Sequence, residues 1–169
     1  MTERSLLTRE ILRDFMSRHR LAVIATASGD GQPEAALINI AVTPELDIIF
    51  ETTSATRKFP NLEMNPRVSL VIGWQGDKTL QLDGMVEELE STAYEKLTPT
   101  FFSAFPEKSS HEYWPGNLYF RVRPYWFRLS AYGVSPKVEE LQIANAPKRR
   151  IPRHYRLYQW FRTVWRGGS

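Results

Sequence analysis

The sequence contains no cysteine, only three histidines and no long apolar run. The absence of cysteine excludes disulfide bonds, thiolate metal sites and a cysteine nucleophile. His19, His111 and His154 lie too far apart in the chain to indicate a metal-binding cluster. No apolar stretch approaches the roughly 20 residues that cross a bilayer. Charged residues soon after Met1 also make the start unlike a signal peptide. We therefore expect a cytoplasmic protein.

The basic charge is concentrated at the carboxyl end. Of the 22 Lys and Arg residues, seven lie in residues 146–169, a segment without acidic residues, so the rest of the chain carries 15 basic and 19 acidic residues. With 169 residues, 42% of them hydrophobic, the chain has the length and composition of one folded domain. We predict a domain over residues 1–145, followed by a basic and aromatic tail over residues 146–169.

Short apolar segments that alternate or run continuously predict a mainly β fold with short helices. The predicted strands span residues 21–27, 35–42, 46–51, 67–74, 80–88 and 118–129. Short turns join the first three strands, so we expect them to form an antiparallel meander. A set of six or seven such strands favours a compact antiparallel β-barrel with helical decoration.

Three helices are expected to accompany the strands. Apolar residues at helical spacing predict an amphipathic helix over residues 6–18. Ser54 or Thr56 is expected to cap a short second helix. Thr92 and Glu95 have the spacing of a capping box, which predicts that a third helix begins there.

One segment combines hydroxyl groups and positive charge. Four hydroxyl residues lead directly into two cations in Thr52-Thr53-Ser54-Ala55-Thr56-Arg57-Lys58, at the predicted junction of a strand and a helix. Hydroxyls, free backbone N–H groups and cations together suit a phosphate group. The alternative interpretation is a capped helix whose two cations are solvated.

Little else in the sequence indicates catalysis by the protein's own side chains. No serine lies in the setting of a nucleophile elbow, and no glycine-rich phosphate loop is present. His111 lies in an aromatic loop beside Tyr113 and Trp114, which suits either ligand contact or a structural role. Chemistry without an evident acid, base or nucleophile points to a bound cofactor.

Seven short motifs occur in a specific order along the chain. They are LAVIATA at residues 21–27, GDGQP at 29–33, IIFET at 48–52, TRK at 56–58, NL at 61–62, NPRVSL at 65–70 and LQLDG at 80–84. Over about residues 5–132, this set resembles the pyridoxamine-phosphate-oxidase-like, FMN-binding split-barrel family. The resemblance implies a six-stranded antiparallel split β-barrel that dimerises and holds FMN in a groove between two subunits.

The resemblance also implies which residues bind the cofactor. Thr56, Arg57 and Lys58 take the phosphate-binding positions, in agreement with the local pattern. Four residues of the second strand and two at the end of the third are expected to line the flavin ring and ribityl chain: Ala36, Leu37, Ile38, Asn39, Glu51 and Thr52. The other subunit is expected to contribute Thr79 and Gln81, and Ser130 takes a further position near the flavin.

Two departures separate the chain from the oxidases that make vitamin B6. Those enzymes carry a basic residue at two positions of the second strand, where this chain has Ala36 and Ala41, and their Trp-Gly-Gly-rich ending is replaced here. The resemblance therefore favours the general branch of the family.

We expect a homodimeric FMN-dependent oxidoreductase that transfers electrons or a hydride between a reduced nicotinamide and an unidentified small molecule. The candidates to line the substrate side are Trp74, Tyr113, Trp114 and Trp126. The alternative is a non-catalytic protein that binds or senses flavin, deazaflavin or haem.

The tail forms the second distinctive feature. If residues 151–166 are helical, one broad face carries Ile151, Tyr155, Tyr158, Phe161 and Trp165 and the opposite side carries arginines. Such a segment suits packing on the barrel or on a second subunit. The other candidate partners are an anionic membrane surface and nucleic acid.

Overall fold

The computed structural model describes residues 7–145, and the predicted tail helix lies outside these residues. The elements follow one another as α1 (Arg9–Arg18), β1 (Leu21–Ala27), β2 (Pro33–Asn39), β3 (Ala41–Val42), β4 (Ile48–Thr53), α2 (Lys58–Met64), β5 (Arg67–Ile72), β6 (Lys78–Glu88), α3 (Ser91–Ala104), the 3-10 helix η1 (Pro106–Tyr113), β7 (Asn117–Ala131) and β8 (Lys137–Gln142). None of the helices in the described range is long and apolar enough to cross a membrane.

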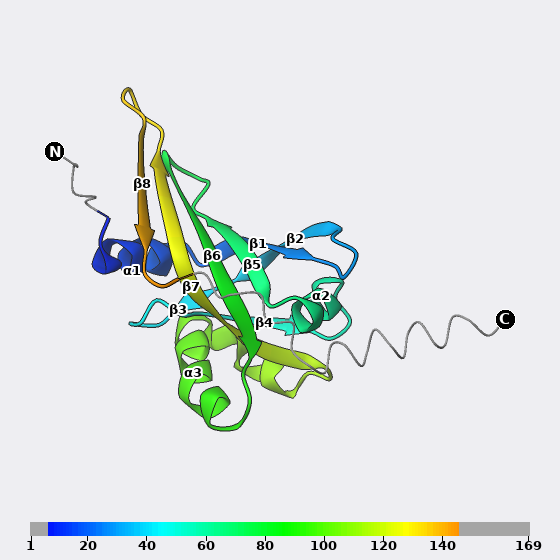
Figure 1. Cartoon of the computed structure of the whole chain (residues 1–169). Helices are drawn as coiled ribbons and strands as arrows, with labels where there is room; N and C mark the ends of the chain where they lie inside the picture. The colour runs from blue at the N-terminus through cyan, green and yellow to red at the C-terminus, as the bar shows by residue number, and fades with distance from the viewer. Residues whose placement is uncertain (1–6, 146–169) are drawn as a thin grey trace.

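All strands belong to one antiparallel sheet with the order β2-β1-β5-β6-β7-β4-β3, and β8 pairs with β7 (Figure 1). The segment 33–42 pairs with β1 through β2 and with β4 through β3, so one stretch of chain joins both ends of this order. The sheet therefore curls on itself. The predicted antiparallel split barrel is confirmed, and so is the predicted pairing within the first three strands.

The six predicted strands account for the barrel, and the structure adds two details. The predicted strand over 35–42 is interrupted at Ile40, which divides it into β2 and β3. The segment 137–142, not predicted as a strand, forms β8, which pairs with the end of β7 on the side opposite β6, so that β6, β7 and β8 project together from the barrel (Figure 1).

Turns and bulges follow from local chemistry. Gly31, with a φ of 90°, occupies the β1–β2 turn in a conformation that few other residues adopt. In the long pairing of β6 with β7, the register shifts between Asp83 and Gly84. A side chain at Gly84 would collide with the Val122 side chain of β7, so glycine allows the two strands to approach closely there.

The helices cover the two apolar regions of the barrel. α1 buries Leu12, Phe15 and Met16 in the main core, and Thr8 caps it by accepting the Ile11 N–H at 3.3 Å. α3 covers a second cluster around Phe101, next to β3 and β4. α2 packs against β1 and β2.

Both predictions of helix capping were wrong. α2 begins at Lys58 with Arg57 as its N-cap residue, and neither Ser54 nor Thr56 caps it. The Thr56 hydroxyl instead donates to the Thr53 carbonyl within the preceding turn, at 2.9 Å. α3 begins at Ser91 after Glu90, without a side-chain cap, so Thr92 lies inside the helix.

Candidate functional site

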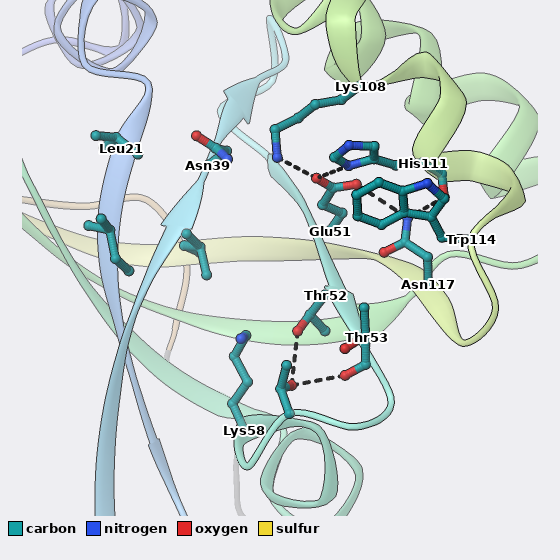
Figure 2. Close-up of a pocket in the computed structure, with 13 residues that line it drawn as sticks. Leu21, Asn39, Glu51, Thr52, Thr53, Lys58, Lys108, His111, Trp114 and Asn117 are labelled. Carbon is teal, nitrogen blue, oxygen red and sulfur yellow. Dashed lines mark hydrogen bonds and ion pairs between the residues drawn. The ribbon is translucent and has the colours of Figure 1, made fainter.

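A cavity of about 310 Å³ lies where the two ends of the sheet order meet, and its lining residues come from three parts of the chain (Figure 2). One side is formed by β1 and β2, with Leu21, Leu37, Ile38 and Asn39. The facing side is formed by β4 and the segment that leads into α2, with Glu51, Thr52, Thr53, Thr56 and Lys58. The helix η1, the turn after it and the first residue of β7 supply Lys108, His111, Trp114 and Asn117.

One end of the cavity carries hydroxyl groups held by the turn after β4. The Thr52 and Thr56 hydroxyl oxygens lie 3.0 Å apart. Because the Thr56 proton is directed at the Thr53 carbonyl, Thr52 is the donor between the two. A hydroxyl hydrogen turns freely about its C–O bond, so the Thr52 hydroxyl can redirect its proton toward a ligand.

Lys58 extends into the same end of the cavity (Figure 2). Its side chain is half-buried, and burial lowers the pKa of its ammonium group below the usual value for lysine. Among residues 7–145, no side chain or carbonyl accepts a hydrogen bond from Lys58, and no carboxylate pairs with it. The site therefore presents a partly desolvated cation whose N–H groups are available to donate hydrogen bonds to a ligand.

The other end of the cavity is organised around the Glu51 carboxylate. Lys108 Nζ donates to Glu51 Oε1 at 2.5 Å, His111 Nδ1 donates to the same oxygen at 3.1 Å, and Asn117 Nδ2 donates to Oε2 at 3.2 Å. Burial raises the pKa of Glu51, but these hydrogen bonds outweigh it, so the pKa of this carboxyl lies below its usual value. The carboxylate stays charged and ties η1 to β4.

An aromatic surface lies next to this carboxylate. The rings of His111 and Trp114 stack with their centroids 3.7 Å apart, and Trp114 is 53% exposed. Gly116 follows with a φ of 73°, and a side chain there would collide with Ser54. This tight turn brings Asn117 back to Glu51, and Asn117 Nδ2 also donates to the His111 carbonyl at 2.9 Å.

The structure brings together seven of the twelve residues predicted to bind the cofactor. These seven line the cavity: Leu37, Ile38, Asn39, Glu51, Thr52, Thr56 and Lys58. Ala36 packs against the barrel core instead, and the exposed guanidinium of Arg57 pairs with Glu34. Of the four aromatic residues predicted to line the substrate side, Trp114 lines the cavity, whereas Trp74, Tyr113 and Trp126 are not among its lining residues.

The two residues assigned to a second subunit, Thr79 and Gln81, lie with Ser130 on another part of the sheet. Thr79 of β6 is the register partner of Ser130 of β7, and Gln81 lies opposite Arg128 in the same pairing. They are not among the lining residues of the cavity in this single chain. Their assignment stays a prediction about the dimer.

Sequence reasoning did not select three of the lining residues: Leu21, Lys108 and Asn117. Lys108 and Asn117 reach Glu51 across 57 and 66 residues of sequence, a separation at which local patterns carry no information. In the sequence, the polar and aromatic composition of the loop over residues 106–117 indicates a role for this loop in the site, and it singles out His111 and Trp114.

Known proteins resemble this chain in sequence and in structure. The sequence model of the family described as pyridoxamine 5'-phosphate oxidase matches residues 8–129. A pyridoxine/pyridoxamine 5'-phosphate oxidase of Rubrobacter xylanophilus is 32% identical over 94 residues, which cover 53% of this chain and 43% of that protein. The matches cover only about a third to a half of the lengths of such curated relatives. For the pyridoxine/pyridoxamine 5'-phosphate oxidase of Bordetella pertussis, 33% of its length is covered.

Solved structures share the fold as well, and two of them show its range. The haem-binding protein of Mycobacterium smegmatis matches with a TM-score of 0.70 at 15% identity, over 79% of this chain and 57% of that one. A pyridoxamine 5'-phosphate oxidase-related, FMN-binding protein of Nostoc punctiforme matches with a TM-score of 0.57 at 12% identity, over 76% of this chain and 87% of that one. At these identities the comparisons establish the split-barrel fold.

Proposed function

Because this chain belongs to the pyridoxamine 5'-phosphate oxidase family, we propose that its cavity binds FMN and that Lys58, Thr52 and Thr56 hold the phosphate. The observation that carries this proposal is the half-buried ammonium of Lys58, which has no partner among residues 7–145. A desolvated cation is unfavourable unless a negative group offsets it. A phosphate beside Lys58 would supply that group.

The donors at this end of the cavity fit a phosphate. A phosphate monoester carries a charge of about −1.5 to −2 near neutral pH and offers three acceptor oxygens. Lys58 can donate up to three hydrogen bonds, and the Thr52 hydroxyl can redirect its proton. Arg57, next to Lys58 in the chain, is the second cation within reach of the turn, and we include it in the phosphate site.

The rest of the cavity suits a flat, partly apolar ring. Its volume of about 310 Å³ lies at the lower end of the range for sites that hold organic ligands. Leu21, Leu37 and Ile38 supply apolar surface on one side, and Asn39 adds a polar group to the same side. On the other side, the charged Glu51 carboxylate holds Lys108 and His111 in place. These residues bind and orient the ring.

We further propose a homodimeric oxidoreductase. When bound, FMN would supply the transfer of electrons or of a hydride, here between a reduced nicotinamide and a small molecule. Leu37 and Trp114 are 58% and 53% exposed at the cavity, which leaves apolar surface for a second subunit to cover. That subunit would bring Thr79 and Gln81 to the ring.

The alternative is a protein that binds flavin, deazaflavin or haem without catalysis. The haem-binding protein of Mycobacterium smegmatis supports it, since that protein shares the fold. A porphyrin with its propionate groups also needs a cation and apolar walls. Lys58 and the leucine side of the cavity would serve those needs as well.

The experiment is to purify the full chain, record its absorption spectrum and identify by mass spectrometry the small molecule released on denaturation. FMN, together with flavin absorption in the blue, supports the proposal. A haem spectrum, or a protein that releases nothing and does not bind added FMN, overturns it. If FMN is bound, oxidation of reduced nicotinamide by the holoprotein distinguishes the oxidoreductase from the non-catalytic alternative.

A further inference from the structure

Glu34 forms a second polar network just beside the proposed phosphate site. Glu34 lies near the start of β2, whose later residues line the cavity, and its side chain is only 16% exposed. Its Oε1 pairs with the Arg57 guanidinium, and its Oε2 accepts a hydrogen bond from Asn61 Nδ2 at 3.0 Å. Asn61 is 4% exposed and also donates to Thr26 Oγ1 at 3.1 Å. The carboxylate is therefore fixed in position by buried groups.

The guanidinium of Arg57 pairs with Glu34, and the rest of the side chain is largely exposed. Its side chain is 83% exposed, and it is not among the residues that line the cavity, although Thr56 and Lys58 on either side of it are. An ion pair with one partner this exposed contributes little to stability because water competes for the charge. Arg57 can therefore leave Glu34 at small cost, while Asn61 continues to hold the carboxylate.

The charges around the cavity leave a phosphate only half neutralised. Lys108 is paired with Glu51, Arg57 is paired with Glu34, and Lys58 is the remaining cation among the described lining segments. A phosphate monoester with nearly two negative charges needs a second cation. The next cation in the sequence, Arg57, is the one that Glu34 already holds.

We propose that Glu34 competes with the ligand's phosphate for Arg57, so that this carboxylate sets the affinity and the selectivity of the site for phosphorylated ligands. The proposal rests on the proposed function, since it concerns the same phosphate. A phosphate, with nearly two negative charges and paired acceptor oxygens, can draw the guanidinium from Glu34 into a forked contact. A ligand without a phosphate leaves the Arg57–Glu34 pair intact.

The test compares FMN with riboflavin, which lacks the phosphate, on four proteins: wild type, Glu34→Gln, Arg57→Ala and the double variant. Glu34→Gln keeps an oxygen for the Asn61 amide and removes the charge. We expect it to tighten FMN binding about two- to fivefold, the range that an exposed ion pair contributes, and to leave riboflavin binding unchanged. In the Arg57→Ala background the same substitution should have no effect on FMN.

Three outcomes of the fluorescence titration would overturn the proposal: weaker FMN binding by Glu34→Gln, equal tightening for riboflavin, or equal tightening without Arg57. A matched control, Glu95→Gln on the exposed side of α3, removes one negative charge elsewhere and should change nothing. The thermal unfolding midpoint of each variant verifies that it is folded.

Failure of the proposed function can be told apart from failure of this inference. If the wild-type protein binds no FMN, the proposed function fails, and titration of the same four proteins with inorganic phosphate, followed by phosphorus NMR, still measures the competition. In addition, the NMR signal of the Arg57 Nε–H group in the wild-type protein should shift when FMN or phosphate is added. An Arg57 signal that stays unchanged at saturation contradicts the exchange, even if Glu34→Gln does not fold.

Discussion

Replacing Lys58 with methionine isolates the contribution of its charge to FMN binding. Methionine keeps an unbranched, mostly apolar side chain of similar length and removes the ammonium group. Since the pKa of Lys58 is already lowered by burial, loss of its charge should not destabilise the fold. The effect should therefore appear in ligand binding, with the free energy of unfolding nearly unchanged.

The size of the effect follows from the proposed contact. A hydrogen bond to a charged group contributes about 1.5–3 kcal/mol, which corresponds to a loss of about 10- to 150-fold in FMN affinity. Riboflavin has no phosphate, so its affinity should change by less than about twofold. The wild-type affinity for FMN should also fall as salt is added, more steeply than that of the variant, because salt screens the lost attraction.

The assay is titration of flavin fluorescence with wild type, Lys58→Met and the control Lys96→Met. Lys96 lies exposed on α3, away from the cavity, so the control removes one positive charge without touching the site. An unchanged FMN affinity in Lys58→Met would refute the reasoning. So would an equal loss of FMN and riboflavin, which would place the lysine at the ring.

Three further predictions follow from the same structure. Glu51→Gln should lower the free energy of unfolding by about 1–3 kcal/mol at pH 7. Because the folded-state pKa of Glu51 lies below its usual value, the carboxylate stabilises the fold above that usual value. The difference from wild type in urea denaturation should therefore shrink as the pH falls through the folded-state pKa, and a constant difference contradicts the reasoning. Gly84→Ala should lower the free energy of unfolding by about 1–3 kcal/mol because the new side chain meets Val122. The control Gly76→Ala, in open space, should change the unfolding midpoint in urea little. Equal effects of the two substitutions would refute the role of the bulge. FMN affinity should fall at alkaline pH because Lys58, with its lowered pKa, loses its proton. Lys58→Arg should remove that fall because arginine stays charged. An identical dependence of FMN affinity on pH in the two proteins would contradict this assignment.

The barrel could be predicted because its strands are short apolar segments separated by turn residues. β1, over Leu21–Ala27, coincides with its predicted range because a continuous apolar run ends there at a turn rich in glycine. β8 was missed because Lys137–Gln142 is charged and mostly exposed, so only its pairing with β7 makes it a strand. The break at Ile40 was missed because both parts of that segment are apolar.

The predicted helix caps failed for a different reason. Thr92 and Glu95 have the spacing of a capping box, but the N-cap position of α3 falls two residues earlier, at Glu90. Thr56 has the right chemistry for a cap, but its hydroxyl is used in the turn that orders the cavity. A cap is decided by where the preceding loop places the backbone, and local sequence does not fix that position.

The candidate site divides along the same line. Thr52, Thr56 and Lys58 are close in sequence, so a local pattern could propose a phosphate site before any fold was known. Glu51 owes its surroundings to Lys108 and Asn117, which tertiary structure alone brings to it. The pairing of Arg57 with Glu34 likewise depends on how α2 packs against β2.

The most direct measurement is a crystal structure of the full chain with FMN bound. The account predicts that phosphate oxygens lie about 3 Å from Lys58 Nζ and from the Thr52 hydroxyl, and that the ring lies beside Leu37 and Ile38. A phosphate bound elsewhere, or the ring system occupying the lysine end of the cavity, would contradict it.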